Sequence, residues 1–135
     1  MSGTEPSTEA MRWIQYARED LEAARSMRSG ETFVPRHVCW LAQQAAEKAL
    51  KAALVSVQME FPRTHDLEWL CRLLPDTFSV QPDDIALSQL SEWAVEARYP
   101  GDWPEATRDD AKSAVKCAEL VVDRVYLGLI SDRRR

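Results

Sequence analysis

Apolar side chains recur every three or four residues along most of the chain, which is the spacing of one face of a helix. The first segment with this spacing ends at Gly30, and glycine is a common helix C-terminal stop. The residues that carry the repeat are Ala10, Ile14, Ala17, Leu21 and Ala24. The pattern predicts a first helix from about residue 10 to residue 30.

The second segment has the composition of a long helix. Pro35 is expected to open it, because a proline in the first turn loses no hydrogen bond. From there to about Gln58 the chain is rich in strong helix formers, and Glu47 and Lys51 form a stabilising pair four residues apart. Its many alanines imply that neighbouring helices approach closely. We therefore expect this helix to be central.

Two further helices are predicted before residue 100. A short one carries Leu67, Leu70, Cys71 and Leu74 as its apolar stripe, with Thr64 or Asp66 as its N-cap and Pro75 at its end. A fourth helix is expected to begin near Pro82 and to reach Arg98 or Tyr99, because Pro100 disfavours helical geometry for the residue before it.

The last helix is expected to start between Asp102 and Thr107. Each of these residues has an acid three positions later, Glu105 or Asp110, which is the pattern of a capping box. The stripe that follows consists of Ala111, Ala114, Val115, Ala118, Val121, Val122, Val125 and Leu129. No segment alternates like a strand. The sequence predicts an all-α, up-and-down antiparallel helical bundle of four long helices plus a short one, over residues 10–130. Residues 1–9 and the basic residues 131–135 are expected to be tails.

Composition narrows the class of protein. The chain has 135 residues, of which 45% are hydrophobic and 29% charged, as in a single soluble globular domain. It has no apolar run of roughly 20 residues and no signal peptide, so a cytoplasmic location without a membrane partner is expected. Three cysteines without a CxxC pair indicate free thiols, and we expect no metal and no cofactor.

Charge limits the kind of nucleic-acid contact. The net charge is −5, and the chain without its three C-terminal arginines is more acidic still. Proteins that track phosphates usually present a basic face. DNA is therefore not an expected partner, and any contact with RNA or a nucleotide has to be local.

Four sequence blocks together resemble the HEPN domain family. They are EDLEAA (19–24), CWLAQQAAEKALKAAL (39–54), THDL (64–67) and ARYP (97–100). The resemblance implies a helical bundle that forms a homodimer. Many HEPN domains are metal-independent endoribonucleases with an arginine followed a few residues later by a histidine. Others are encoded beside a minimal nucleotidyltransferase in a toxin–antitoxin-like pair, or form the substrate-binding helical domain of aminoglycoside nucleotidyltransferases.

The family motif carries over at one residue only. Arg98 matches the motif arginine, but no histidine occurs in residues 99–105, so the chain is similar to the branch with an ARYP motif. Arg98 could stabilise a developing phosphorane and Tyr99 could donate a proton, which makes both catalytic candidates. Asp102 or Glu105 could accept a proton in the same reaction. A structural cation at the helix end, or an ion pair with Glu47 or Glu96, is the alternative for Arg98.

The predicted ligand-binding set is Glu47, Lys48, Arg98, Tyr99 and Trp103. Trp103 is either a loop anchor or a stacking platform for a base. Gln43, Gln44, Glu47 and Lys48 fit the polar side of an amphipathic helix. His65 fits a solvent-facing or capping position, and a catalytic base that reaches the Arg98 site is the alternative.

Three functions follow as hypotheses. The first is a HEPN component of a two-component nucleotidyltransferase system that binds a nucleotide or RNA near Arg98. The second is an endoribonuclease toxin with a modified motif. The third is a non-catalytic adaptor that uses its tryptophans to hold a partner.

Overall fold

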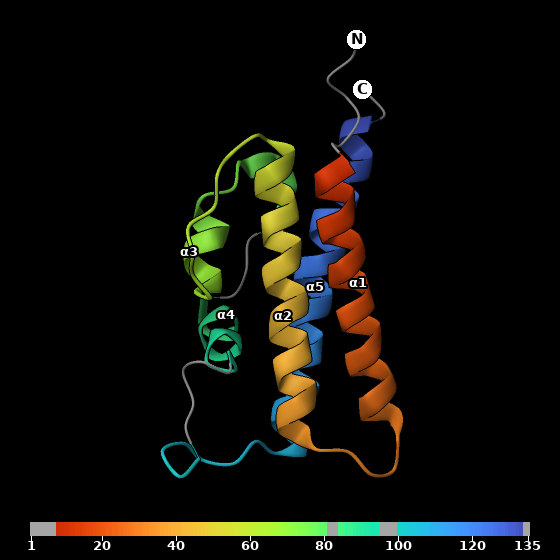
Figure 1. Ribbon diagram of the computed structural model, residues 1–135, viewed down its shortest axis with the longest axis vertical. Helices are drawn as coiled ribbons and strands as arrows, with labels where there is room; N and C mark the ends of the chain where they lie inside the picture. The colour runs from red at the N-terminus through yellow and green to blue at the C-terminus, as the bar shows by residue number, and fades with distance from the viewer. Residues whose placement is uncertain (1–7, 81–83, 95–99, 134–135) are drawn as a thin grey trace.

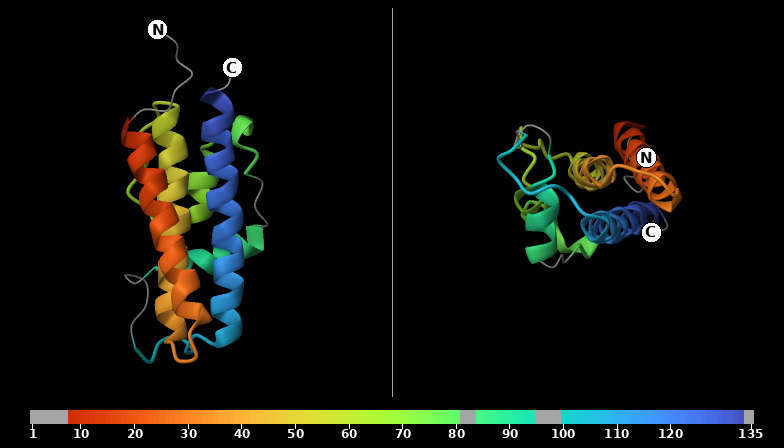
Figure 2. Two further views of the ribbon diagram at one scale, coloured as in Figure 1. Left: turned by 90° about the vertical axis from the view of Figure 1, so that its right-hand side faces the viewer. Right: turned by 90° about the horizontal axis from the view of Figure 1, so that it is seen from below.

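The computed structural model describes residues 8–80, 84–94 and 100–133, without the side chains of residues 84–85 and 132–133. Its long helices are α1 (Thr8–Ser29), α2 (Pro35–Ser56) and α5 (Arg108–Arg133), and they lie side by side (Figures 1 and 2). α2 makes its most extensive contacts with α1 and α5. α1 runs antiparallel to α2, whereas α5 runs in the same direction as α2 (Figure 1).

The core lies where these long helices meet. α2 begins at Pro35 as predicted, and its alanines at 42, 45, 46, 49, 52 and 53 are fully buried. Side chains this small let the backbones of α1 and α5 approach closely, which explains the alanine-rich sequence. All eight residues of the predicted stripe on α5 are also buried. The central position of α2 is therefore confirmed.

A return leg of short helices connects α2 to α5. It consists of α3 (Leu67–Arg72), the single 3₁₀ turn η1 (Asp76–Phe78) and α4 (Asp84–Ser91), and it lies beside α2 in Figure 1. Of the two predicted N-caps for α3, the structure has Asp66, whose side chain accepts a hydrogen bond from the Trp69 amide at 3.2 Å. No strand occurs in the described parts of the chain, and the all-α fold is confirmed.

The extent of the fourth helix corrects the sequence prediction. α4 ends at Ser91, and the amides of Glu92 and Trp93 then donate to the carbonyls three residues before them. The Ser91 hydroxyl accepts a hydrogen bond at 2.9 Å from the amide of Leu67, the first residue of α3. Leu90 and Ala94 stay buried, which is why the apolar spacing resembled one continuous helix. The return leg thus takes the place of a fourth long helix.

α5 begins with the second of the two predicted capping boxes. The Asp110 amide donates to the Thr107 hydroxyl at 3.0 Å, and the Thr107 amide donates to the Asp110 carboxylate at 2.9 Å. α5 continues to Arg133, so residues 131–133 of the expected basic tail are helical. Near this end η1 packs closely on α5, because a Cβ placed on Gly128 would lie 2.6 Å from the Phe78 ring.

Candidate functional site

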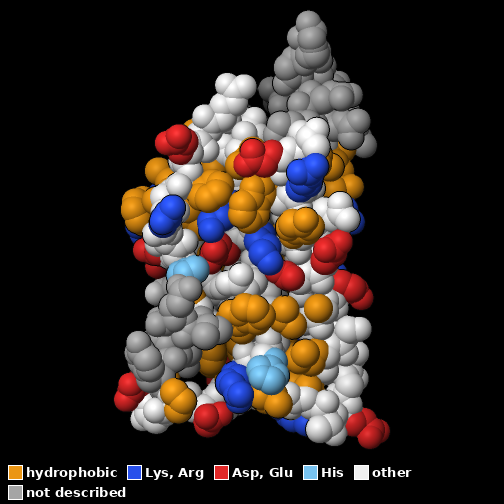
Figure 3. All heavy atoms as spheres, in the orientation of Figure 1, with side chains coloured by type: hydrophobic (Ala, Val, Ile, Leu, Met, Phe, Trp, Pro, Cys, Tyr) orange, Lys and Arg blue, Asp and Glu red, His pale blue; other side chains and the backbone are white. Residues whose placement is uncertain are grey.

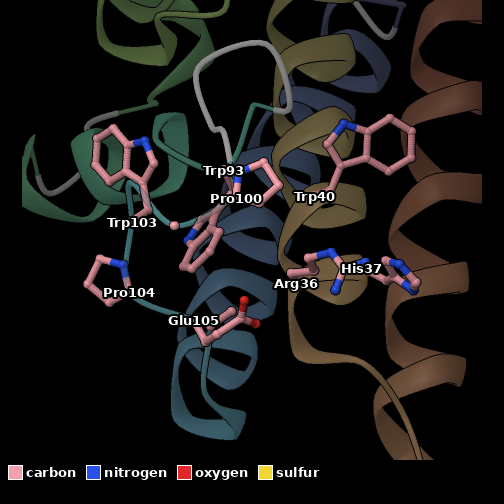
Figure 4. Close-up of a pocket in the computed structure, with 10 residues that line it drawn as sticks. Arg36, His37, Trp40, Trp93, Pro100, Trp103, Pro104 and Glu105 are labelled. Atoms are coloured by element: carbon pink, nitrogen blue, oxygen red, sulfur yellow. The ribbon is translucent and has the colours of Figure 1, made fainter.

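A cavity of about 600 Å³ opens between the N-terminal half of α2 and the connection that leads into α5. Three tryptophans line it: Trp40 on α2, Trp93 just after α4, and Trp103 in the connection (Figure 4). Trp40 and Trp103 remain 38% and 39% exposed, so much of their indole surface faces solvent. We call this space the tryptophan cavity.

The first turns of α2 and α5 fix the positions of the two walls of the tryptophan cavity. Pro35 sets the first turn of α2, and Arg36 and Trp40 lie four residues apart, hence on the same side of that helix. On the other wall, the Thr107 cap fixes where the connection meets α5. Gly101 has a φ of +88°, a backbone conformation that favours glycine, and it turns the connection before Trp103.

The cavity has apolar walls and a few ionisable groups. Arg36 and His37 lie on α2, and Glu105 lies on the opposite wall, with its carboxylate extended toward α2 in Figure 4. On the face seen in Figure 3, hydrophobic side chains gather around the lower part of α2, where basic and histidine side chains also reach the surface. Such a site is suited to a flat, partly apolar ligand that also carries charge.

A second polar cluster lies further along α2. Glu47 is seven residues beyond Trp40, about 10 Å along the helix. Its carboxylate lies 2.8 Å from the Lys51 ammonium, 2.8 Å from Nδ1 of His65 and 3.0 Å from the Gln43 amide nitrogen. We call these four residues the Glu47 cluster.

The Glu47 cluster corrects the prediction of a solvated polar side of the helix. Gln43 is fully buried and Glu47 is 5% exposed. The Lys51 ammonium lies 5.0 Å from the centre of the Phe61 ring, and the same ring packs edge-on against Trp13. His65 belongs to a distant segment and comes to Glu47 through the turn that precedes α3. A buried carboxylate that accepts three hydrogen bonds is satisfied, and it fixes the orientation of the groups around it.

Electrostatics keeps Glu47 ionised. Burial by itself would raise the pKa of this carboxyl, because the charged form loses hydration. Hydrogen bonds from Lys51, His65 and Gln43, together with the charge of Lys51, outweigh burial and hold the pKa below its ordinary value. When the ionised carboxylate accepts a hydrogen bond from Nδ1–H of His65, the neutral imidazole carries its acceptor lone pair on Nε2.

The predicted ligand-binding residues do not all come together. Trp103 lines the tryptophan cavity and Glu47 centres its own cluster. Lys48 instead lies in the contact between α1 and α2, with its ammonium 2.6 Å from the Asp20 carboxylate. Arg98 and Tyr99 lie outside the described residues, and the prediction for them stays a prediction. Pro100, which follows them directly, lines the tryptophan cavity.

Sequence reasoning missed several lining residues. No ligand role was predicted for Trp40, Trp93, Arg36, His37 or Glu105. A usable signal was present in the segment PGDWPEA (100–106), where a tryptophan and two prolines stand beside two acids that do not cap the helix. For the Glu47 cluster the signal was the spacing of Gln43, Glu47 and Lys51 on an otherwise alanine-rich helix.

Comparisons with known proteins agree on one family. A family model described as HEPN domain matches residues 10–129. The crystal structure of TT1696 from Thermus thermophilus is 27% identical, with a TM-score of 0.77, over 91% of this chain and 100% of that chain. The crystal structure of ST0689, an archaeal HEPN homologue, is 28% identical, with a TM-score of 0.70, over 89% of this chain and 97% of that chain.

Three further results bear on the class of protein. No curated protein sequence matches the chain significantly. Within the described residues, none of the helices is long and apolar enough to cross a membrane. The described residues also contain no group of three or more histidine, cysteine or acidic side chains arranged to hold a metal ion.

Proposed function

Because the chain belongs to the HEPN domain family, we propose that it binds a nucleotide or a short RNA segment as one component of a two-component system with a minimal nucleotidyltransferase. The tryptophan cavity is the observation that supports this proposal. Its three indoles offer stacking surfaces, and it is lined by Pro100, the last residue of the ARYP motif.

The size and chemistry of the cavity suit such a ligand. Small-molecule sites typically enclose about 300 to 1,000 Å³, and this cavity is within that range. Stacking of one base on an aromatic side chain contributes about 1–3 kcal/mol. Arg36 and His37 add donors for a phosphate at one wall. A chain with a net charge of −5 is poorly suited to a long RNA backbone, and this favours a short ligand.

Tryptophan fluorescence tests the proposal directly. Titration of the full chain with nucleoside monophosphates is expected to give saturable quenching. Trp103→Ala should weaken binding about tenfold, because it removes one stacking surface.

Trp69→Ala is the matched control, since Trp69 is 46% exposed on α3 and does not line the cavity. It should leave the dissociation constant unchanged. Absence of saturation in the wild type, or equal loss in both variants, would contradict binding at the tryptophan cavity.

The partner is tested by co-expression. A tagged chain should co-purify with the nucleotidyltransferase encoded beside it, and the absence of such a neighbour would count against this part of the proposal. The predicted homodimer belongs to the same proposal and is measured by sedimentation of the purified chain.

A second function, metal-independent RNA cleavage, is favoured by the contact between His65 and Glu47. In such a step Nε2 of His65 takes the 2′-hydroxyl proton, the 2′-oxygen bonds to phosphorus, and the bond to the 5′-oxygen breaks. Arg98 would offset the phosphorane charge and Tyr99 would protonate the leaving oxygen. The products are a 2′,3′-cyclic phosphate and a 5′-hydroxyl.

Bulk RNA incubated without metal distinguishes the two functions. Under the cleavage hypothesis the wild type produces cyclic-phosphate ends, and His65→Ala and Arg98→Ala each slow this by about a hundredfold or more. Arg72→Ala is the control, because Arg72 is an exposed cation on α3 that belongs neither to the tryptophan cavity nor to the Glu47 cluster. Intact RNA in the wild-type reaction leaves binding as the function.

A further inference from the structure

We infer that the tryptophan cavity prefers guanine over the other bases, with Glu105 as the residue that reads the base. This inference rests on the proposed function, because it names the ligand class of the same cavity. It starts from the contrast between the walls, which are aromatic, and the few polar groups that lie between them.

Stacking alone does not select a base. Every base has a flat face, and an indole accepts each of them with similar strength. Trp40, Trp93 and Trp103 therefore account for affinity and not for choice. Any preference has to come from hydrogen bonds at the edges of the base.

Glu105 brings a pair of acceptors to the cavity. It is the only acidic side chain among the described lining residues, and in Figure 4 its carboxylate extends from the connection toward α2. An ionised carboxylate accepts hydrogen bonds and donates none. The base that fits it best presents two neighbouring donors on one edge.

Guanine is the base with that edge. Its N1–H and its 2-amino group lie side by side and can donate to the two oxygens of one carboxylate. Adenine and cytosine place a ring-nitrogen acceptor beside their amino group, and uracil places a carbonyl on each side of its single N–H. Each of these sets an acceptor against the carboxylate of Glu105, which is unfavourable.

The opposite wall complements the rest of a guanine nucleotide. Arg36 lies on α2, across the cavity from Glu105 (Figure 4). A guanidinium donates as a fork and matches either a phosphate or the O6 and N7 acceptors of guanine. In Figure 4 the guanidinium of Arg36 is directed toward His37, so it has to rotate toward the cavity to donate to a guanine nucleotide whose N1–H and 2-amino group are bound by Glu105.

Four titrations at one salt concentration, with GMP, AMP, CMP and UMP, test the preference, and a fifth with IMP tests the 2-amino group. GMP is expected to bind about tenfold more tightly than AMP, CMP or UMP, because a well-placed bidentate contact discriminates by about that factor or more. IMP, which lacks only the 2-amino group, should bind more weakly than GMP. This comparison changes the ligand and leaves the protein intact.

Two variants in the connection of residues 100–106 test whether Glu105 is the residue that selects the base. Glu105→Gln replaces one acceptor with a donor, and the preference for GMP should fall to less than about threefold. Asp102→Asn removes the same charge from the same connection at a residue that does not line the cavity, and it should keep the preference.

The outcomes separate the inference from the proposed function. GMP binding no more tightly than AMP, or a preference that survives in Glu105→Gln, overturns the inference and leaves nucleotide binding intact. No saturation with any of the four nucleotides overturns the proposed function and the inference with it. Tighter binding of choline than of GMP also overturns both, because the tryptophans would then form a cage for an organic cation.

Discussion

Glu47 shows how one charged residue of the alanine-rich helix α2 can be buried in the protein core. Its carboxylate is buried, yet it accepts hydrogen bonds from two side chains of its own helix and from His65. A residue of this kind stabilises the fold only while it is ionised. Its contribution to stability must therefore depend on pH.

We predict that Glu47→Gln lowers the free energy of unfolding by about 2 kcal/mol at neutral pH, because charged hydrogen bonds are lost. The folded pKa lies below the unfolded value of about 4.5, so the contribution is present above that pH and disappears as the pH falls through the folded pKa. The difference between wild type and variant should shrink as the pH is lowered below about 4.5, measured by urea titrations at several pH values.

The control for this prediction is Glu119→Gln. Glu119 pairs with Arg25 at 2.7 Å, but both side chains are partly exposed, and such pairs contribute less than about 1 kcal/mol. A difference for Glu47→Gln that stays constant from acid to neutral pH would show that ionisation of Glu47 does not support the fold.

At the scale of elements, η1 packs closely against α5 because the residue of α5 at the contact, Gly128, has no side chain. Gly128 lies within α5, where alanine is ordinarily favoured over glycine by about 1 kcal/mol. Here a Cβ would lie 2.6 Å from Cδ1 and 3.1 Å from Cε1 of Phe78, which is too close for both atoms to stay in place. The glycine is therefore explained by packing.

We predict that Gly128→Ala destabilises the protein by about 1 kcal/mol, because displacing the Phe78 ring costs more than the gain in helix propensity. Thermal unfolding followed by circular dichroism measures the change. Ser113→Ala, at an exposed position of the same helix, should stay within about 0.5 kcal/mol of the wild type. A more stable Gly128→Ala variant would show that the Phe78 ring moves aside easily.

The helices also show which boundaries a sequence can specify. Pro35 and the pair of Thr107 and Asp110 are local signals, and both helix starts were predictable from them. The end of α4 was not predictable, since Ser91 bonds to the amide of Leu67, which is far away in the sequence. A helix end that is set by a tertiary contact does not change the spacing of apolar residues, so that spacing cannot reveal where the helix ends.

The candidate site was only partly predictable, for the same physical reason. Trp103 was predicted from the sequence as either a loop anchor or a stacking platform for a base. Trp40 and Trp93 lie where core residues also lie on a helical stripe, and their partial exposure depends on where the connection of residues 100–106 passes. The burial of Glu47 likewise depends on His65, eighteen positions away.

At the scale of the whole molecule, the core and the candidate site are formed by different parts of the chain. The long helices α1, α2 and α5 form the core, and α1 begins at the end of the bundle where α5 finishes (Figure 1). The tryptophan cavity lies at the opposite end of α5, beside its N-terminus. Its walls come from α2, from the turn after α4 and from the connection into α5. Changes in these walls leave most of the core packing untouched.

The capping box at Thr107 has a consequence for how such a protein can diversify. It ends the connection of residues 100–106 at a defined point, and the helix that follows keeps its own start signal whatever comes before it. A new ligand preference can therefore arise by exchange of a few surface residues without a new scaffold. The helical bundle can thus keep its fold while the short segment with Trp103 and Glu105 varies in sequence.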